Sequence, residues 1–353
     1  MEFIKKITGN ITAIDEGLMK KTQGRLDNLT KPQGSLGRLE ELSKQICGIT
    51  RKENPSLRNK VIFTLASDHG VVDEGVSPYP REVTAQMVYN FLAGGAGINV
   101  LAKHVGARVV VVDIGVAADF KPNPKLVVKK INYGTKNMAK GPAMTRDEAI
   151  KAICAGIEIF EDEFKRGIDI VGTGEMGIGN TTASSAITAV FTKKPINDVT
   201  GRGAGLDDKG LEKKISVIEK SLSVNKPDPS DAIDVLSKVG GFEIGGLTGI
   251  ILAAAAKKVP IVIDGFISGA AALVAFHLEP KVKEYMIAAH CSVESGHKAI
   301  LEYIGLRPLL DLNLRLGEGT GAALGISIVE ASIKILTEMA TFQSASVSQK
   351  IDT

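Results

Sequence analysis

The chain has 353 residues, of which 44% are hydrophobic and 24% are charged, and its formal net charge is only +3. This length suggests about two domains, or one large α/β domain with a helical annex. The small charge and the scattered basic residues exclude the electrostatic footprint of a nucleic-acid-binding protein. The three cysteines are far apart and form no CxxC pair, so we expect neither disulfides nor zinc knuckles, and a cytoplasmic location.

The first sixty residues form a polar region with a helical pattern. Apolar residues recur at helix-like spacing over 11–22 and 36–49, and the breaker-rich segment 30–35 separates the two. This pattern indicates an annex rather than a layer of the core. From residue 60 onward, short β-branched runs alternate with longer helical patterns. A last amphipathic helix is predicted over 320–339, again of the annex type.

Five of the short runs are almost entirely apolar, as expected for parallel strands that are covered on both faces. These runs are residues 61–66, 108–114, 168–171, 260–264 and 285–289. The helical patterns between them are residues 83–103, 149–164, 181–191, 211–223 and 246–257. The alternation predicts an α/β fold with a doubly wound, mostly parallel sheet flanked by helices. The apolar stretch 261–278 contains Asp264 and Ser268, so it predicts a strand, a turn and a buried helix rather than a membrane span.

Glycine-rich or polar loops follow four of the strands or comparable apolar segments. They are residues 67–70, 172–182, 200–205 and 314–321. In an open parallel sheet such loops meet beyond the carboxyl ends of the strands. Together they therefore predict a single ligand site.

The second of these loops carries the strongest chemical signal, because its glycines and the helix N-terminus after it are typical of a phosphate site. Gly172-x-Gly174-x-x-Gly177 also fits the dinucleotide fingerprint, with Asp198 at the distance expected of a ribose-binding acid. A nicotinamide-dependent oxidoreductase is therefore an alternative. Glu175 opposes it, since this residue places a negative charge where the pyrophosphate would lie. A tight strand–helix turn without a ligand is a third interpretation.

The other two glycine loops add charged side chains. Arg202 lies in the third loop, and Lys213 and Lys214 lie in the next helix, so we expect a ligand with one terminal phosphate unless the lysines are solvated. Glu318 is flanked by glycines at the start of the last helix. It is either a general base that faces a cleft or an acid that the helix dipole favours.

The remaining candidates for chemistry are histidines and their neighbours. Asp68 and His69 suggest a metal, but no second histidine lies at a ligand spacing, so we expect neither a metal nor a cofactor. His290 and Cys291 follow a predicted strand, and a partly buried, hydrogen-bonded pair is a better interpretation than a nucleophile.

Several of these segments together resemble one family, the nicotinate-nucleotide–dimethylbenzimidazole phosphoribosyltransferases of cobalamin biosynthesis. The matching segments are residues 29–37, 67–71, 74–77, 174–182, 201–203 and 316–321. The resemblance implies an α/β nucleotide-binding domain over 60–319 and a small helical domain built from both chain ends, residues 1–59 and 320–353. It also implies a homodimer.

The resemblance implies roles for individual residues as well. Glu318 corresponds to the catalytic base, and Glu175 is similar to a second acid in the same pocket. The residues expected at the nucleotide phosphate and ribose are Gly177, Ile178, Gly179, Asn180, Thr181, Gly203, Lys213, Lys214, Leu316 and Gly317. Those expected at the aromatic base are Ser77, Tyr79, Pro80, Gln86 and Met176. Which of the two lysines meets the phosphate stays open.

The implied reaction transfers the 5-phosphoribosyl group of nicotinate mononucleotide to 5,6-dimethylbenzimidazole or a related base. The products are an α-riboside 5′-phosphate and nicotinate. The leaving ring is already a pyridinium and needs no general acid, whereas the incoming base becomes cationic on attack and must lose a proton. One carboxylate therefore suffices. The alternatives are an oxidoreductase with its dinucleotide at residues 172–177 and a nucleotide-binding module without catalysis.

Overall fold

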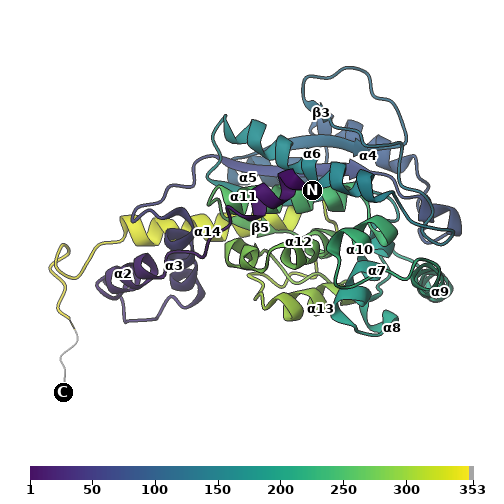
Figure 1. The fold of residues 1–353 in the computed structure, drawn as a ribbon. Coiled ribbons are helices and arrows are strands. Elements are labelled where there is room, and N and C mark those ends of the chain that lie inside the picture. Colours follow the sequence, from purple (N-terminus) through teal and green to yellow (C-terminus); the bar gives the residue numbers. More distant parts are fainter. Residues whose placement is uncertain (350–353) are drawn as a thin grey trace.

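The centre of the molecule is a six-stranded sheet, as the computed structural model shows for residues 1–349, which it describes (Figure 1). The strands are β1 Lys60–Ser67, β2 Ala107–Gly115, β3 Leu126–Val128, β4 Ile170–Met176, β5 Ile261–Ile263 and β6 Met286–Ala288. They are parallel and lie in the order β3-β2-β1-β4-β5-β6. The order reverses between β1 and β4, where doubly wound sheets bind their ligands. The predicted fold class is confirmed.

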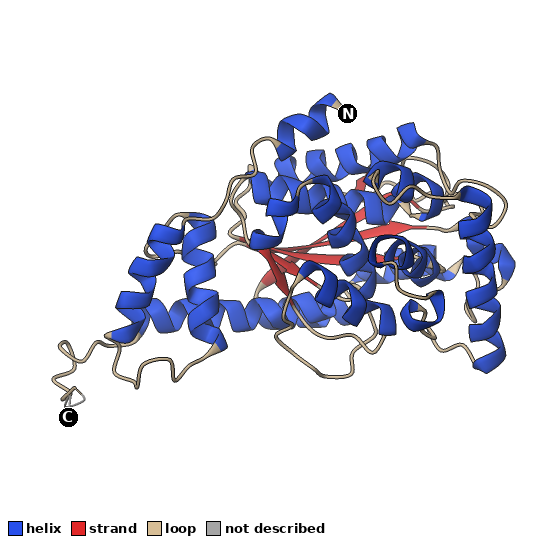
Figure 2. Cartoon of the chain, turned by 60° about the horizontal axis from the view of Figure 1, so that its bottom comes forward, coloured by secondary structure: helices blue, strands red, loops and turns tan. Residues whose placement is uncertain are grey.

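Helices cover both faces of this sheet (Figure 2). In the first half of the chain they are α1 Glu2–Thr8, α2 Glu16–Asp27, α3 Arg38–Thr50, α4 Val83–Ala93, α5 Gly97–Val105 and α6 Arg146–Phe164, with the 3₁₀ turn η1 Gly70–Glu74. The others are α7 Asn180–Thr192, α8 Ile196–Val199, α9 Asp208–Asn225, α10 Ala232–Val239, α11 Phe242–Ala256, α12 Phe266–Leu278, η2 Pro280–Tyr285, α13 Ser295–Ile304 and α14 Thr320–Glu338.

The side chains of β1 explain why helices are needed on both faces. Val61, Phe63 and Leu65 belong to one hydrophobic core, which also contains residues of α6 and α11. Ile62 and Ala66 belong to a second core, together with residues of α5 and α14. Successive side chains of a strand point to opposite faces, so a continuous apolar run is buried only if both faces are covered.

Several predicted elements are wrong in their extent. The helix predicted over 11–22 is α2, Glu16–Asp27, and the one predicted over 246–257 begins at Phe242 as α11. The helix predicted over 83–103 is two helices, because Gly94 takes a left-handed φ of 82° and ends α4. The strand predicted over 168–171 continues to Met176 as β4, so Gly172 and Gly174 lie in a strand and not in a turn. Strand β3, with only three residues, and the helices α1, α8, α10 and α13 lie outside the predicted elements.

Helix α14 connects two parts of the molecule. It packs against β4 and β5 of the sheet and also against α3, which lies with α2 at one end of the molecule (Figure 1). It is long and apolar enough to cross a membrane, but 56% of its most apolar stretch is buried, as in a core helix. Helix α1 packs on α6 and α11. The division of the chain into 60–319 and the two ends stays a prediction.

Candidate active site

A cavity of about 630 Å³ lies beyond the carboxyl ends of β1, β4, β5 and β6. Its lining residues fall in the segments 76–87, 175–181, 203–204, 265–267, 290–294 and 313–318. The location is the one expected for a doubly wound sheet, and the volume is that of a site for a small organic ligand.

Glu318 lies in this lining, immediately before α14. The residue is only 4% exposed, and its carboxylate Oε2 accepts a hydrogen bond of 3.0 Å from the backbone N–H of Ile98. Burial raises the pKa of Glu318 above its usual range, and the nearby Asp264 raises it further. The carboxylate thus faces the N-terminus of α5 rather than that of its own helix. Its raised pKa lies closer to neutral pH than that of an exposed glutamate, which suits a general base.

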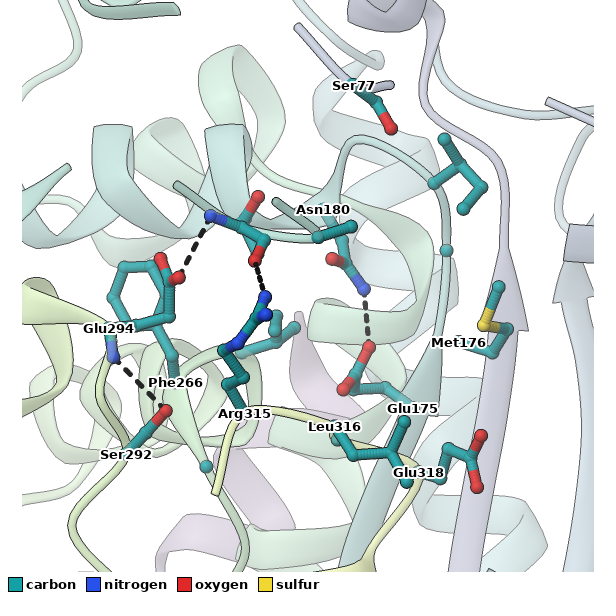
Figure 3. Close-up of a pocket in the computed structure, with 18 of the residues that line it drawn as sticks. Ser77, Glu175, Met176, Asn180, Phe266, Ser292, Glu294, Arg315, Leu316 and Glu318 are labelled. Carbon is teal, nitrogen blue, oxygen red and sulfur yellow. Dashed lines mark hydrogen bonds between the residues drawn. The ribbon is translucent and has the colours of Figure 1, made fainter. Parts of the chain in front are cut away.

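Glu175 is a second buried acid of the cavity, at the end of β4. Its carboxylate accepts a hydrogen bond from the amide Nδ2 of Asn180 (Figure 3). Burial raises the pKa of Glu175 to about 8, with further contributions from the charges of Asp264, Glu243 and Glu318. Glu175 is therefore protonated at neutral pH, while Glu318 is the acid with backbone N–H partners for its charged form.

The helix N-terminus after β4 also opens at the cavity. Gly179 begins α7 with a left-handed φ of 93°, and as a glycine it gives α7 no side-chain cap. Gly177 lies so close to the backbone of β1 that a Cβ atom there would collide with the carbonyl of Ser67. Ile178 donates its N–H to Thr84 Oγ1 at 3.1 Å, which fixes the loop. Such an N-terminus is a natural site for a phosphate.

The two neighbouring lysines of α9 differ in their surroundings. Lys214 is fully buried, and its Nζ donates to Thr181 Oγ1 at 2.9 Å and to the carbonyl of Gly201 at 3.1 Å. Burial lowers the pKa of Lys214 to about 8, against the opposing influence of Glu294. The Nζ of Lys213 instead lies beside Gly75. Of the two lysines, Lys214 is therefore the one that contacts a residue of the cavity lining, Thr181.

A chain of hydrogen bonds joins the far wall of the cavity to the loop 201–205 (Figure 3). The N–H of Gly203 donates to Glu294 Oε1 at 2.9 Å, and its carbonyl accepts from Arg315 at 3.0 Å. The N–H of Glu294 in turn donates to Ser292 Oγ at 3.3 Å. The two charged side chains thereby fix the position of Gly203, next to Lys214.

Comparison with known proteins agrees with this geometry. A family model described as a phosphoribosyltransferase matches residues 11–347. The chain is 58% identical to the nicotinate-nucleotide–dimethylbenzimidazole phosphoribosyltransferase of Desulforudis audaxviator, over 99% of both chains, and 57% identical to that of Geobacter metallireducens over their full lengths. The chain belongs to this phosphoribosyltransferase family.

A solved structure supports the same assignment. It is a nicotinate-nucleotide–dimethylbenzimidazole phosphoribosyltransferase of Thermus thermophilus, 41% identical, with a TM-score of 0.91 over 96% of this chain and 100% of that chain. The oxidoreductase alternative is not supported by these relatives. The structure gives the physical reason: Gly172 and Gly174 are strand residues of β4, so the glycine spacing does not form a dinucleotide-binding turn.

Most residues expected at the site of this phosphoribosyltransferase do line the cavity. They are Ser77, Tyr79, Glu175, Met176, Gly177, Ile178, Gly179, Asn180, Thr181, Gly203, Leu316, Gly317 and Glu318. Pro80, Gln86, Lys213 and Lys214 lie outside the lining, although Lys214 contacts the lining residue Thr181. On α4 the lining contains Val83 and Met87 instead of Gln86. Val83 and Met87 are four residues apart and so share one face of this helix. The individual roles stay predictions.

Sequence reasoning missed several residues of the cavity wall, above all Phe266, Ser292 and Glu294. A signal for them existed. They come a few residues after the predicted strands 260–264 and 285–289, at the same carboxyl edge that identified the other loops. The two strands were correctly predicted, but the segments that follow them contain few glycines, and only His290 and Cys291 were considered there.

The two histidines considered from the sequence, His69 and His290, each lie close to a buried carboxylate. His69 Nε2 lies 2.6 Å from Glu243 Oε1, and both side chains are buried beneath the Gly177–Gly179 turn. His290 lines the cavity with Asp264 behind it, at 3.8 Å between Nε2 and Oδ1. Within residues 1–349, no group of three or more His, Cys, Asp or Glu side chains is placed to hold a metal ion.

Proposed function

We propose that this chain transfers the 5-phosphoribosyl group from nicotinate mononucleotide to 5,6-dimethylbenzimidazole or a related base, for assembly of the cobalamin nucleotide loop. The names of its relatives support this reaction. The observation that carries it is one cavity with a buried carboxylate, Glu318, on one side and a phosphate cradle on the other (Figure 3).

The cradle accounts for the nucleotide half of the reaction. The N-terminus of α7, the loop at Gly203 and the buried cation of Lys214 converge next to Thr181. Charge-assisted hydrogen bonds from such groups bind one terminal phosphate, as a mononucleotide provides. The ribose then lies between this cradle and Glu318.

Glu318 accounts for the chemical step. Attack by a ring nitrogen of the incoming base on the ribose carbon releases nicotinate and leaves a proton on the second ring nitrogen. Glu318 accepts that proton, and its raised pKa brings its proton affinity closer to that of the cationic ring. Met176 and Leu316, which line the same side of the cavity, provide apolar contacts for a flat ring.

Glu175 has a different role in this proposal. Because its pKa is about 8, it is neutral at pH 7 and acts as a hydrogen-bond donor or spacer rather than as a second base. A neutral Glu175 also avoids a second negative charge beside Glu318, which would hinder loss of the proton from Glu318.

A direct assay tests the function. The purified chain is mixed with nicotinate mononucleotide and, in separate reactions, with dimethylbenzimidazole, benzimidazole, adenine or a phenol. We expect free nicotinate and one equivalent of a new α-riboside 5′-phosphate with at least one base. Absence of product with every base would refute the proposal, and tight binding of NAD(H) without binding of nicotinate mononucleotide would favour the oxidoreductase.

We also propose that the enzyme is a homodimer in the cytoplasm. The family resemblance supports the dimer, and the three free cysteines suit a reducing compartment. Light scattering coupled to size exclusion checks the first point: a mass near 37.3 kDa, that of a single chain, would contradict it.

A further inference from the structure

The turn that carries Glu318 has an unusual backbone. Gly317, Glu318 and Gly319 have φ values of 80°, 63° and 99°, so three consecutive residues are left-handed. Glycine adopts this region freely, whereas a glutamate does so only when its surroundings impose it. Non-glycine residues with positive φ are often part of functional sites, where the rest of the structure holds them. Something must therefore hold this turn.

Asp264, immediately after β5, binds the 317–319 turn and the first turn of α14 through its carboxylate. Its Oδ2 accepts a hydrogen bond of 3.1 Å from the N–H of Gly319, and its Oδ1 accepts one of 2.9 Å from Ala322. Gly319, the N-cap of α14, has no side chain with which to cap the helix. The Asp264 carboxylate, 1% exposed, thus supplies the cap from a distant strand.

Two contacts hold the same turn from the other side. Thr64 Oγ1 of β1 donates a hydrogen bond of 2.9 Å to the carbonyl of Glu318. Gly174 of β4 leaves the space for that carbonyl, since a Cβ atom there would collide with it. The carbonyl of Glu318 is bound by Thr64 and the N–H of Gly319 by Asp264, so the peptide between these two residues is held from both sides, and Glu318 lines the cavity.

We propose that Asp264 is a positioning residue for the transfer reaction: its carboxylate caps α14 and holds the 317–319 turn so that Glu318 faces the substrate. The inference rests on the proposed function, in which Glu318 is the base. Asp264 itself is not among the residues that line the cavity, so in this proposal it contacts no substrate. It acts on the reaction through Glu318.

The charge of Asp264 has a second effect on the same base. The ionisable groups that face it are Glu175 at the end of β4, His290 after β6 and Glu318 before α14. Its negative charge raises the pKa of both glutamates. Removal of this charge should lower the pKa of Glu318, so that the base stays ionised at lower pH.

The test compares two isosteric variants with opposite expectations. Asp264→Asn removes the charge and one of the acceptors of the α14 cap, while Asp231→Asn makes the same change at the cap of α10, outside the cavity lining. We expect Asp264→Asn to lower kcat about 10- to 100-fold, with the KM for nicotinate mononucleotide changed by less than about threefold. The acid limb of its pH–rate profile should move to lower pH. Asp231→Asn should leave both unchanged.

A folded Asp264→Asn protein with wild-type kcat and an unshifted acid limb would overturn the inference. If this variant does not fold, Thr64→Val decides, because it removes the other bond to the turn without burying a new group: reduced kcat supports the inference and unchanged kcat overturns it. Glu318→Gln separates the two proposals. If Glu318→Gln is as active as the wild type, the assigned base is wrong; if only Glu318→Gln is slow, the assignment stands and Asp264 is not its positioning residue.

Discussion

Three helices that begin outside the cavity lining, α6, α9 and α10, are capped differently from three that begin at the cavity, α7, α12 and α14. The N-termini of α6, α9 and α10 are capped by the side chains of their own N-cap residues, Thr145, Asp207 and Asp231. The cavity helices α7, α12 and α14 begin after glycines that provide no side chain. A local cap contributes about 1 kcal/mol to stability, which the three cavity helices do not obtain from their own N-cap residues.

The missing local caps leave N–H groups at the cavity free to bind other groups. The N-terminal N–H groups of helices near the cavity are available to partners from elsewhere in the chain. Asp264 binds the N-terminus of α14, and Glu318 binds that of α5, whose N-cap residue is Ala96. The N-terminus of α7, which lies beside Lys214 and Gly203, is the one that we propose for the substrate phosphate. Sites often give up local stability in this way.

The largest effect on activity should follow from a substitution of Glu318, the carboxylate that binds the N-terminus of α5. Glu318→Gln keeps an oxygen for the N–H of Ile98 but cannot take a proton. We expect kcat to fall about 10²- to 10⁴-fold, since this is the usual contribution of a general base. Nicotinate release measured by chromatography checks the rate. Activity within a few-fold of the wild type would mean that Glu318 only caps α5.

Next comes the cation beside the α7 N-terminus. Lys214→Met should lower kcat/KM about 10- to 100-fold, mainly through a higher KM for nicotinate mononucleotide, because a charge-assisted hydrogen bond to phosphate is worth about 1.5–3 kcal/mol. Lys213→Met is the matched control and should change kcat/KM less than about twofold. Equal effects of the two substitutions would place the phosphate elsewhere.

The buried acid Glu175, at the cavity, should make the stability of the protein depend on pH. Its pKa is raised from the ordinary value of 4.5 to about 8, so the folded protein binds a proton that the unfolded chain releases between these values. Stability should therefore fall as pH rises across this window. Urea unfolding at pH values from about 5 to 8 measures the decline, which should be shallower in Glu175→Gln. Parallel curves for the variant and the wild type would show that Glu175 is ionised in the fold.

A surface cap should give the smallest effect. Thr145→Ala removes the side chain that accepts the N–H of Glu148 at the start of α6, and should cost about 1 kcal/mol of unfolding free energy. Because Thr145 is remote from the cavity lining, kcat and KM should stay at wild-type values. A loss of activity without loss of stability would contradict the distinction between helices with a local cap and helices that begin at the cavity.

Much of the fold followed from the sequence because its strands are apolar on both faces. The run at 61–66 has no polar alternation, and this is the pattern of a covered parallel strand. The break after α4 was missed because the apolar spacing continues through it, although Gly94 and Gly95 signal an end. β3 was missed because three residues give too short a pattern.

The site was predictable where local chemistry is unusual and not where it depends on tertiary contacts. Glu318 and the Gly177–Gly179 turn stand out because glycines surround them. Asp264 does not, since an aspartate after a strand gives no sign that it binds a helix N-cap 55 residues later. The choice between Lys213 and Lys214 was equally hidden, because it depends on which side of α9 faces Thr181.

The central claim is that Glu318 removes a proton from the incoming base, and a substrate without that proton tests it most directly. 1-Methylbenzimidazole attacks through its free nitrogen and gives a cationic product that has no proton to lose. We predict a wild-type to Glu318→Gln ratio of kcat of about 10² or more with benzimidazole, and a ratio near one with 1-methylbenzimidazole. The same large ratio with both bases would contradict the claim and assign Glu318 another role.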